Sequence, residues 1–130
     1  MSYSQAFAQI PAWLYFLFGS LFGACVASFL GVVGERVPRR ETLGGRSHCV
    51  CGAPLRAGAN VPVLGWLLAG GRAKCCGAKI PARYVLSEIA LALVWGMATW
   101  LSPNWVICAL AMSFTAALLL WSVWVPASKQ

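Results

Sequence analysis

The sequence predicts an all-α membrane protein with three transmembrane helices and a basic, cysteine-bearing cytoplasmic loop between the first and second helices. Hydrophobic residues make up 60% of the chain and charged residues only 10%, whereas soluble proteins carry roughly 25% charged residues. Nine of the ten Lys and Arg residues fall in residues 36–83, and only Lys129 lies outside that window. Long uncharged stretches flank the window on both sides. At 130 residues, we expect one membrane domain covering residues 1–130.

The first predicted span covers residues 11–34, a run of 24 residues without a charge. This length exceeds the ~20 residues needed to cross the hydrocarbon core. Its positive charges follow the apolar run rather than precede it, so a cleaved signal peptide is not expected. Pro11 suits the first turn of a helix, where its missing N–H breaks no hydrogen bond.

Small residues recur every four positions in this first span, as Gly19, Gly23, Ala27 and Gly31. Such a stripe lets two helix backbones approach closely in lipid. We therefore interpret it as a helix-packing face rather than as a binding site.

The second and third predicted spans cover residues 84–101 and 105–125, joined by the tight polar connection 102–104. Aromatic residues near the span ends fit interfacial belts; they are Trp13, Tyr15, Trp100, Trp105, Trp121 and Trp124. Short loops rich in Lys and Arg stay in the cytoplasm during insertion. We therefore expect a multi-pass membrane protein with its N-terminus outside the cytoplasm, a cytoplasmic loop 36–83 and a cytoplasmic C-terminus. The same charge is compatible with anionic membrane lipids, and no nucleic-acid partner is expected.

Four cysteines lie in the loop as two clusters, Cys49 with Cys51 and Cys75 with Cys76. Because the loop is rich in Gly and Pro and small segments seldom fold without a metal, disulfides or a partner, these cysteines suggest a structural, zinc-ribbon-like site with four thiolate ligands. Disulfides are rare in the cytoplasm, but a disulfide or redox pair and unliganded thiols remain alternatives. Adjacent cysteines seldom both reach one metal, so His48 is an alternative ligand.

The remaining two cysteines, Cys25 and Cys108, lie inside predicted spans. We interpret them as small apolar fillers.

A series of motifs resembles the N-terminal region of the bacterial type IV prepilin peptidases, bifunctional leader peptidase/N-methyltransferases of type IV pilus and type II secretion systems. The similarity covers about residues 23–101, and it implies a protein of the bacterial inner membrane with a periplasmic N-terminus. In chain order, the motifs are Ala27-Ser28-Phe29-Leu30-Gly31-Val32-Val33, Arg36-Val37-Pro38, Ser47-His48-Cys49, Cys51-Gly52, Asn60-Val61-Pro62-Val63-Leu64-Gly65-Trp66, Gly71-Arg72, Cys76-Gly77, Arg83-Tyr84 and Leu86-Ser87-Glu88.

The sequence also departs from the family pattern. The family's two C-x-x-C pairs appear as C-x-C and as a segment in which Ala73 replaces the third cysteine. Gly31 stands where the family usually has Asn, and Val85 where it usually has Pro. The resemblance implies a peptidase that uses two aspartates, but all three acidic residues here are Glu. An aspartic peptidase needs two carboxylates sharing one site, so we expect no leader cleavage by this chain alone.

The resemblance further implies transfer of a methyl group from S-adenosylmethionine to the N-terminal amine of a cleaved pilin. Glu88 is the one acid inside a predicted span, and an intramembrane carboxylate is a functional candidate. It would accept the proton of the amine or hold the cationic cofactor; the alternative is an ion pair with Arg83 or another loop base. Gly71 and Arg72 match a Gly-Lys/Arg pair that the family associates with methyl transfer. Glu35 and Glu41 are expected to be solvated counter-charges.

Three functions remain open at this point. The first is prepilin or pseudopilin maturation, by methyl transfer or by completing a separately encoded aspartyl peptidase chain. The second is a non-catalytic membrane adaptor of the same fold that binds pilins or secretion components. The third is an unrelated small membrane protein whose loop binds a metal or acidic lipid.

Overall fold

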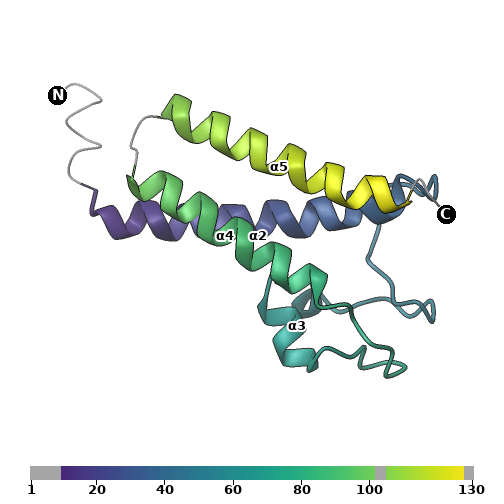
Figure 1. Cartoon of the computed structure of the whole chain (residues 1–130). Helices are drawn as coiled ribbons and strands as arrows, with labels where there is room; N and C mark the ends of the chain where they lie inside the picture. Colours follow the sequence, from purple (N-terminus) through teal and green to yellow (C-terminus); the bar gives the residue numbers. More distant parts are fainter. Residues whose placement is uncertain (1–9, 102–104, 128–130) are drawn as a thin grey trace.

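The computed structural model describes residues 10–101 and 105–127. Long helices α2 (Ala12–Arg36), α4 (Arg83–Leu101) and α5 (Trp105–Ala127) form a bundle, and the short helices η1 (Ala57–Asn60) and α3 (Leu64–Ala69) belong to the loop between α2 and α4 (Figure 1). Within the described ranges the only β structure is two isolated bridges. The expectation of an all-helical fold is therefore confirmed.

Two of these helices, α2 and α4, have the length and apolar composition of membrane spans. Their boundaries lie within two residues of the predicted spans 11–34 and 84–101. The third helix, α5, is 23 residues long, and its described apolar part is Cys108–Trp121. Whether α5 crosses the membrane, as expected for residues 105–125, stays a prediction. The predicted connection 102–104 and Lys129 lie outside the described residues.

The small-residue stripe of α2 is its contact face with α4, as the sequence predicted. Gly19, Gly23 and Ala27 are buried. A Cβ atom placed on Gly23 would lie 2.5 Å from the carbonyl oxygen of Leu91, so the two backbones approach closely there. Helices without a hydrophobic driving force between them associate through such contacts. The stripe therefore positions α4 along the length of α2.

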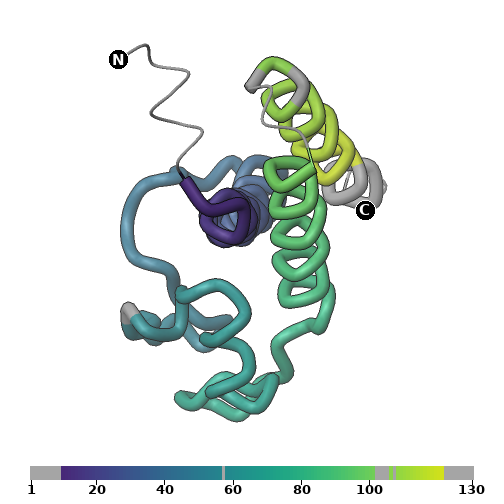
Figure 2. The backbone as a smooth tube through the Cα atoms, turned by 90° about the vertical axis from the view of Figure 1, so that its left-hand side faces the viewer, coloured from purple at the N-terminus to yellow at the C-terminus, as the bar shows by residue number. Residues whose placement is uncertain are grey.

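The bundle core forms where α5 covers this helix pair. Ala27, Leu91 and Trp95 are its buried centre. The indole N–H of Trp95 donates a 2.8 Å hydrogen bond to Oγ1 of Thr115 on α5. Figure 2 shows α5 beside α4, with α3 and the loop segments around it on the opposite side of α2 and α4 from α5.

The orientation of the bundle can be tested with reporter fusions. A reporter inserted at Gly58, in the basic loop, is expected to behave as cytoplasmic, whereas one at Pro103 is expected to behave as periplasmic, because Lys- and Arg-rich short loops are retained inside. Alkaline phosphatase and green fluorescent protein activities measure the two locations. A periplasmic signal at Gly58 would reverse the orientation and remove the reason to expect reduced cysteines.

Candidate functional site

The loop folds into two tight turns that each present a pair of cysteines. In the first knuckle, residues 48–54, the N–H of Cys49 donates to the carbonyl of Ala53 at 2.9 Å, and the N–H of Gly52 donates to the carbonyl of Cys49 at 2.8 Å. Residues His48 and Pro54 form an antiparallel bridge at its base. Gly52 has a φ of +82°, which glycine adopts without strain. This turn explains how a C-x-C spacing directs both thiols to one side.

The second knuckle, residues 72–79, has a similar construction. The N–H of Ala73 donates to the carbonyl of Ala78 at 2.8 Å, and the N–H of Gly77 donates to the carbonyl of Ala73 at 2.7 Å. Residues Arg72 and Lys79 bridge at its base. Ala73, at the place of the third family cysteine, is buried in the turn and contributes backbone rather than a ligand.

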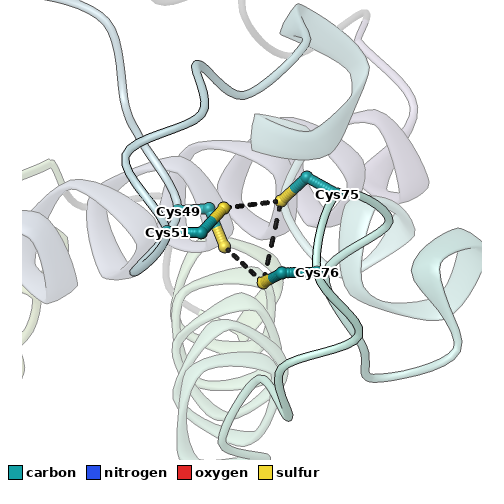
Figure 3. A group of neighbouring side chains, drawn as sticks. All are labelled: Cys49, Cys51, Cys75 and Cys76. Atoms are coloured by element: carbon teal, nitrogen blue, oxygen red, sulfur yellow. Dashed lines mark hydrogen bonds between the residues drawn. The ribbon is translucent and has the colours of Figure 1, made fainter.

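The two knuckles face each other and bring four thiols together (Figure 3). The sulfurs of Cys49, Cys51, Cys75 and Cys76 all lie within 4.8 Å of one another. Cys51 and Cys75 are 3.4 Å apart, Cys49 and Cys76 3.5 Å, and Cys75 and Cys76 3.9 Å. These distances exceed the ~2.05 Å of a disulfide bond.

The cluster could hold a metal ion, and its geometry fits tetrahedral zinc. Zinc–sulfur bonds of ~2.3 Å in a tetrahedron separate the sulfurs by roughly 3.8 Å, close to the three separations above. Adjacent Cys75 and Cys76 both reach the centre, although the sequence suggested that such neighbours rarely do. The reason is that the turn splays their side chains toward different partners, Cys51 and Cys49. His48 lies outside this group, with Nδ1 2.8 Å from the carbonyl oxygen of Arg46.

Hydrogen bonding within the cluster separates the thiol pKa values. The backbone N–H of Cys51, followed by the thiols of Cys75 and Cys76, lowers the pKa of Cys49 to about 7. The neighbouring sulfurs of Cys49 and Cys51 raise the pKa of Cys75 to about 12. The backbone of Ala78 lowers the pKa of Cys76, but the thiols of Cys49 and Cys51 together with desolvation outweigh it, so that this pKa is raised as well. A metal that binds thiolates would displace the protons that remain on these sulfurs.

A second feature lies where the loop meets α4. Glu88, in the second turn of α4, is only 8% exposed. Its Oε2 atom accepts a 2.6 Å hydrogen bond from the backbone N–H of Val63, the residue that precedes α3. Val63 has a φ of +62°, which is a genuine outlier for a β-branched residue. Glu88 thus holds a strained loop residue against the helix bundle.

The alternative in which Glu88 pairs with Arg83 is wrong for this structure. Arg83 instead lies 3.6 Å from the carboxylate of Glu35 and over the ring of Tyr84. Residues five apart on an α-helix project about 140° from each other, so Arg83 and Glu88 do not share a face. Glu35 is therefore paired, although the side chains of Arg83 and Glu35 are 71% and 42% exposed and such a pair contributes little stability.

Gly71 and Arg72 lie at the base of the second knuckle. Gly71 has a φ of +67°, and a Cβ atom there would lie 2.9 Å from the ring of Trp66. Arg72 donates through Nη1 to the carbonyl of Gly77 at 3.5 Å. These contacts support the turn that carries Cys75 and Cys76, whereas Glu88 binds the loop at Val63. A role for Gly71 and Arg72 in methyl transfer stays a prediction.

Sequence reasoning missed the structural role of the segment before α3. The side chain of Asn60 donates to Oγ of Ser47 at 3.4 Å, which links the first knuckle to η1. A hollow of about 230 Å³ lies between this segment and α2; it is lined by Cys25, Ser28, Phe29, Val32, Ser47, Asn60 and Pro62. The motif Asn60–Trp66 was visible in the sequence. The positive φ of Val63 could not be predicted, because valine seldom adopts this conformation.

Comparison with known proteins agrees with these features. Residues 21–102 match the Bacterial Peptidase A24 N-terminal domain. The chain is 32% identical to a Prepilin leader peptidase/N-methyltransferase of Aeromonas salmonicida, over 75% of this chain and 47% of that protein. Proteins of the same name from Burkholderia pseudomallei and Myxococcus xanthus are 34% and 40% identical, over 88% and 65% of this chain and 46% and 25% of their own lengths. No solved structure matches.

The chain spans about half the length, or less, of these relatives. The two apolar helices and the relatives together indicate an inner-membrane protein. The domain match covers α2 from Leu21 onward, both knuckles, Glu88 and the rest of α4. The chain therefore belongs to the family of the Bacterial Peptidase A24 N-terminal domain.

Proposed function

We propose that this protein acts in the maturation of type IV prepilins or type II secretion pseudopilins. In this proposal the domain methylates the N-terminal amine of the cleaved pilin with S-adenosylmethionine, or completes a separately encoded aspartyl peptidase chain. The match over residues 21–102 and the relatives named leader peptidase/N-methyltransferase support the process. Because the 130 residues contain no aspartate, methyl transfer is favoured over leader cleavage.

The observation that carries the proposal is the position of Glu88. It is the buried acid of the described residues, located where the loop meets a membrane helix. One of its oxygens holds Val63. A carboxylate of this kind suits an amine substrate, because desolvated charge interacts strongly with a cation or a dissociating proton.

The reaction requires few groups. The neutral amine of the pilin attacks the methyl carbon of the sulfonium; a C–N bond forms and the S–C bond breaks, with S-adenosylhomocysteine leaving. Glu88 is the proposed acceptor of the proton that the N-terminal ammonium must lose before this attack, and the product remains as the methylated ammonium. A positioned general base of this type contributes roughly 10²–10⁴-fold in rate.

The four-cysteine cluster has a structural role in this proposal. Zinc would be held by the thiolates of Cys49, Cys51, Cys75 and Cys76 and would lock the two knuckles together. The second knuckle ends at Lys79, four residues before α4 begins. A locked cluster would therefore fix the loop relative to Glu88.

A second candidate function is a non-catalytic membrane adaptor that binds pilins or secretion components. It is favoured by the fact that Glu88 already has a structural partner in Val63. In that case the carboxylate maintains the loop, and the exposed basic residues of the loop provide the binding surface.

The substitution Glu88→Gln separates the two functions. Glutamine keeps an oxygen that can accept the Val63 N–H but lacks the charge and basicity of the carboxylate. We expect methylation of a cleaved pilin peptide to fall by about 100-fold or more, with membrane insertion and metal content unchanged. Transfer of the labelled methyl group from S-adenosylmethionine measures the activity.

Two further variants sharpen this test. Glu35→Gln removes a second carboxylate at the same end of the bundle, which is 42% exposed and paired with Arg83. It should leave methylation within about twofold, as expected for a weak surface pair. Arg72→Ala should weaken methylation less than Glu88→Gln, because it removes a loop contact rather than a chemical group. If Glu88→Gln lowers protein yield and changes no activity, Glu88 has a structural role and the adaptor function is favoured.

A further inference from the structure

The short helix α3 presents an unpaired apolar face. Leu64, Leu67 and Leu68 follow an i, i+3, i+4 pattern, which places them on one side of the helix. They are 55%, 56% and 73% exposed, respectively. Three exposed leucines in a helix of six residues form a contiguous apolar surface, which is unusual in contact with water.

The opposite face of α3 is fixed to the protein. Gly65 is buried against the backbone of Ala59. The indole N–H of Trp66 donates to the carbonyl of Ile80 at 3.1 Å, and its ring lies against Gly71. The three leucines cannot turn inward without breaking these contacts, so their outward direction is part of the fold.

The depth of α3 along the bundle follows from its anchor. Val63, directly before α3, is bound to Glu88, which lies five residues after the start of α4 at Arg83. At 1.5 Å per residue this is about 7.5 Å from the helix end. Pro62 also lines the same hollow as Ser28 of α2, eight residues before the end of that helix. The loop thus folds back along the spans, and Figure 1 shows α3 beside the Arg83 end of α4.

The distribution of charge around α3 also resembles that of a helix at a membrane surface. Residues 57–71 contain no charged side chain, although the rest of the loop is strongly basic. Arg56 and Arg72 border this uncharged stretch. Interfacial helices bury an apolar face about 5–10 Å into the boundary between headgroups and acyl chains, with basic residues at the polar edge. Both the depth and the charge pattern of α3 agree with this arrangement.

We infer that α3 is an interfacial helix, whose Leu64, Leu67 and Leu68 are covered by acyl chains of the leaflet on the loop side. The lipid surface is favoured over a protein partner because α2 and α4 have the composition of spans and place α3 at the depth of the bilayer boundary. Arg56 and Arg72 then lie at the level of anionic headgroups, which attract basic residues near the surface. Contact of α3 with the membrane would also help to keep Val63, the residue before this helix, against Glu88.

A photo-crosslinking experiment tests this inference. Benzoylphenylalanine is introduced at Leu68 or Leu64 in the full chain, which is reconstituted in vesicles of phosphatidylethanolamine and phosphatidylglycerol and irradiated. Phe18, an exposed residue within α2, is the positive control for lipid contact. Val50, 90% exposed at the tip of the first knuckle, is the matched control for an apolar loop residue in water. Lipid adducts are quantified by mass spectrometry.

The expected result is a lipid-adduct yield at Leu68 or Leu64 close to that at Phe18 and at least fivefold above that at Val50. Adducts at either leucine position support the inference, so that one variant that fails to fold does not decide the test. Yields at both positions equal to that at Val50 would contradict it. Crosslinks to a second protein chain in place of lipid would assign this face to a protein interface and overturn the inference equally.

Discussion

Replacing Gly23 by alanine is expected to destabilise the bundle by about 1–3 kcal/mol, the usual cost of overpacking. The added methyl carbon would lie 2.5 Å from the carbonyl oxygen of Leu91 and 2.9 Å from its carbonyl carbon. These are backbone atoms of α4, so the contact can be relieved only if the two helices move apart. Such a shift would also disturb Trp95, whose Cβ lies near the same point. Thermal unfolding of the purified protein in detergent measures the loss.

Gly31→Ala is the matched control on the same helix. A Cβ atom at Gly31 meets only the ring edge of Tyr84, at 3.4 Å, which is an ordinary contact with a side chain. We expect a midpoint equal to that of the unsubstituted protein or slightly higher, because alanine loses less backbone entropy than glycine in a helix. If Gly23→Ala unfolds at the same temperature as the unsubstituted protein, α2 and α4 do not pack through this stripe.

Removing the cysteine cluster is expected to unfold the loop while the long helices survive. The purified protein should contain about one zinc ion per chain, and this metal should be lost when Cys49, Cys51 and Cys76 are replaced by serine. Small metal-bound modules derive much of their folding free energy from the metal, and the knuckles contain only a few backbone hydrogen bonds of their own. Elemental analysis measures the metal, and limited proteolysis with circular dichroism measures the loop and the helices.

Cys25→Ser is the control for this experiment. Cys25 is an exposed thiol on α2, outside the group of four. Zinc content and protease resistance of the loop should be unchanged by this substitution. A protein that is free of metal and yet has a protease-resistant loop would exclude a structural metal site.

The helices were predictable from the sequence because their signal is local. An uncharged run longer than the hydrocarbon thickness defines α2, and the spacing of Gly19, Gly23 and Ala27 indicates its packing face. Both properties follow from residue type and helical period alone.

The geometry of the site was only partly predictable. The sequence identified the four cysteines as ligands but suggested that adjacent residues such as Cys75 and Cys76 seldom both reach one metal, since the turn at Gly77 is not apparent from a C–C spacing. Glu88 was recognised as unusual from its place in a span. Its partner, Val63, lies 25 residues away and has no polar side chain to suggest it, so only the folded loop reveals the contact.

We propose that this chain carries out the methyl transfer of prepilin maturation and not the leader cleavage. The most direct measurement is mass spectrometry of two substrates, an intact prepilin and a leader-free pilin peptide, each incubated with the purified chain and S-adenosylmethionine. We expect the intact prepilin to keep its leader at every pH tested, because no aspartate pair is present, and the leader-free peptide to gain one methyl group at its N-terminus. Removal of the leader by the chain alone, or a leader-free peptide that stays unmodified, would contradict it.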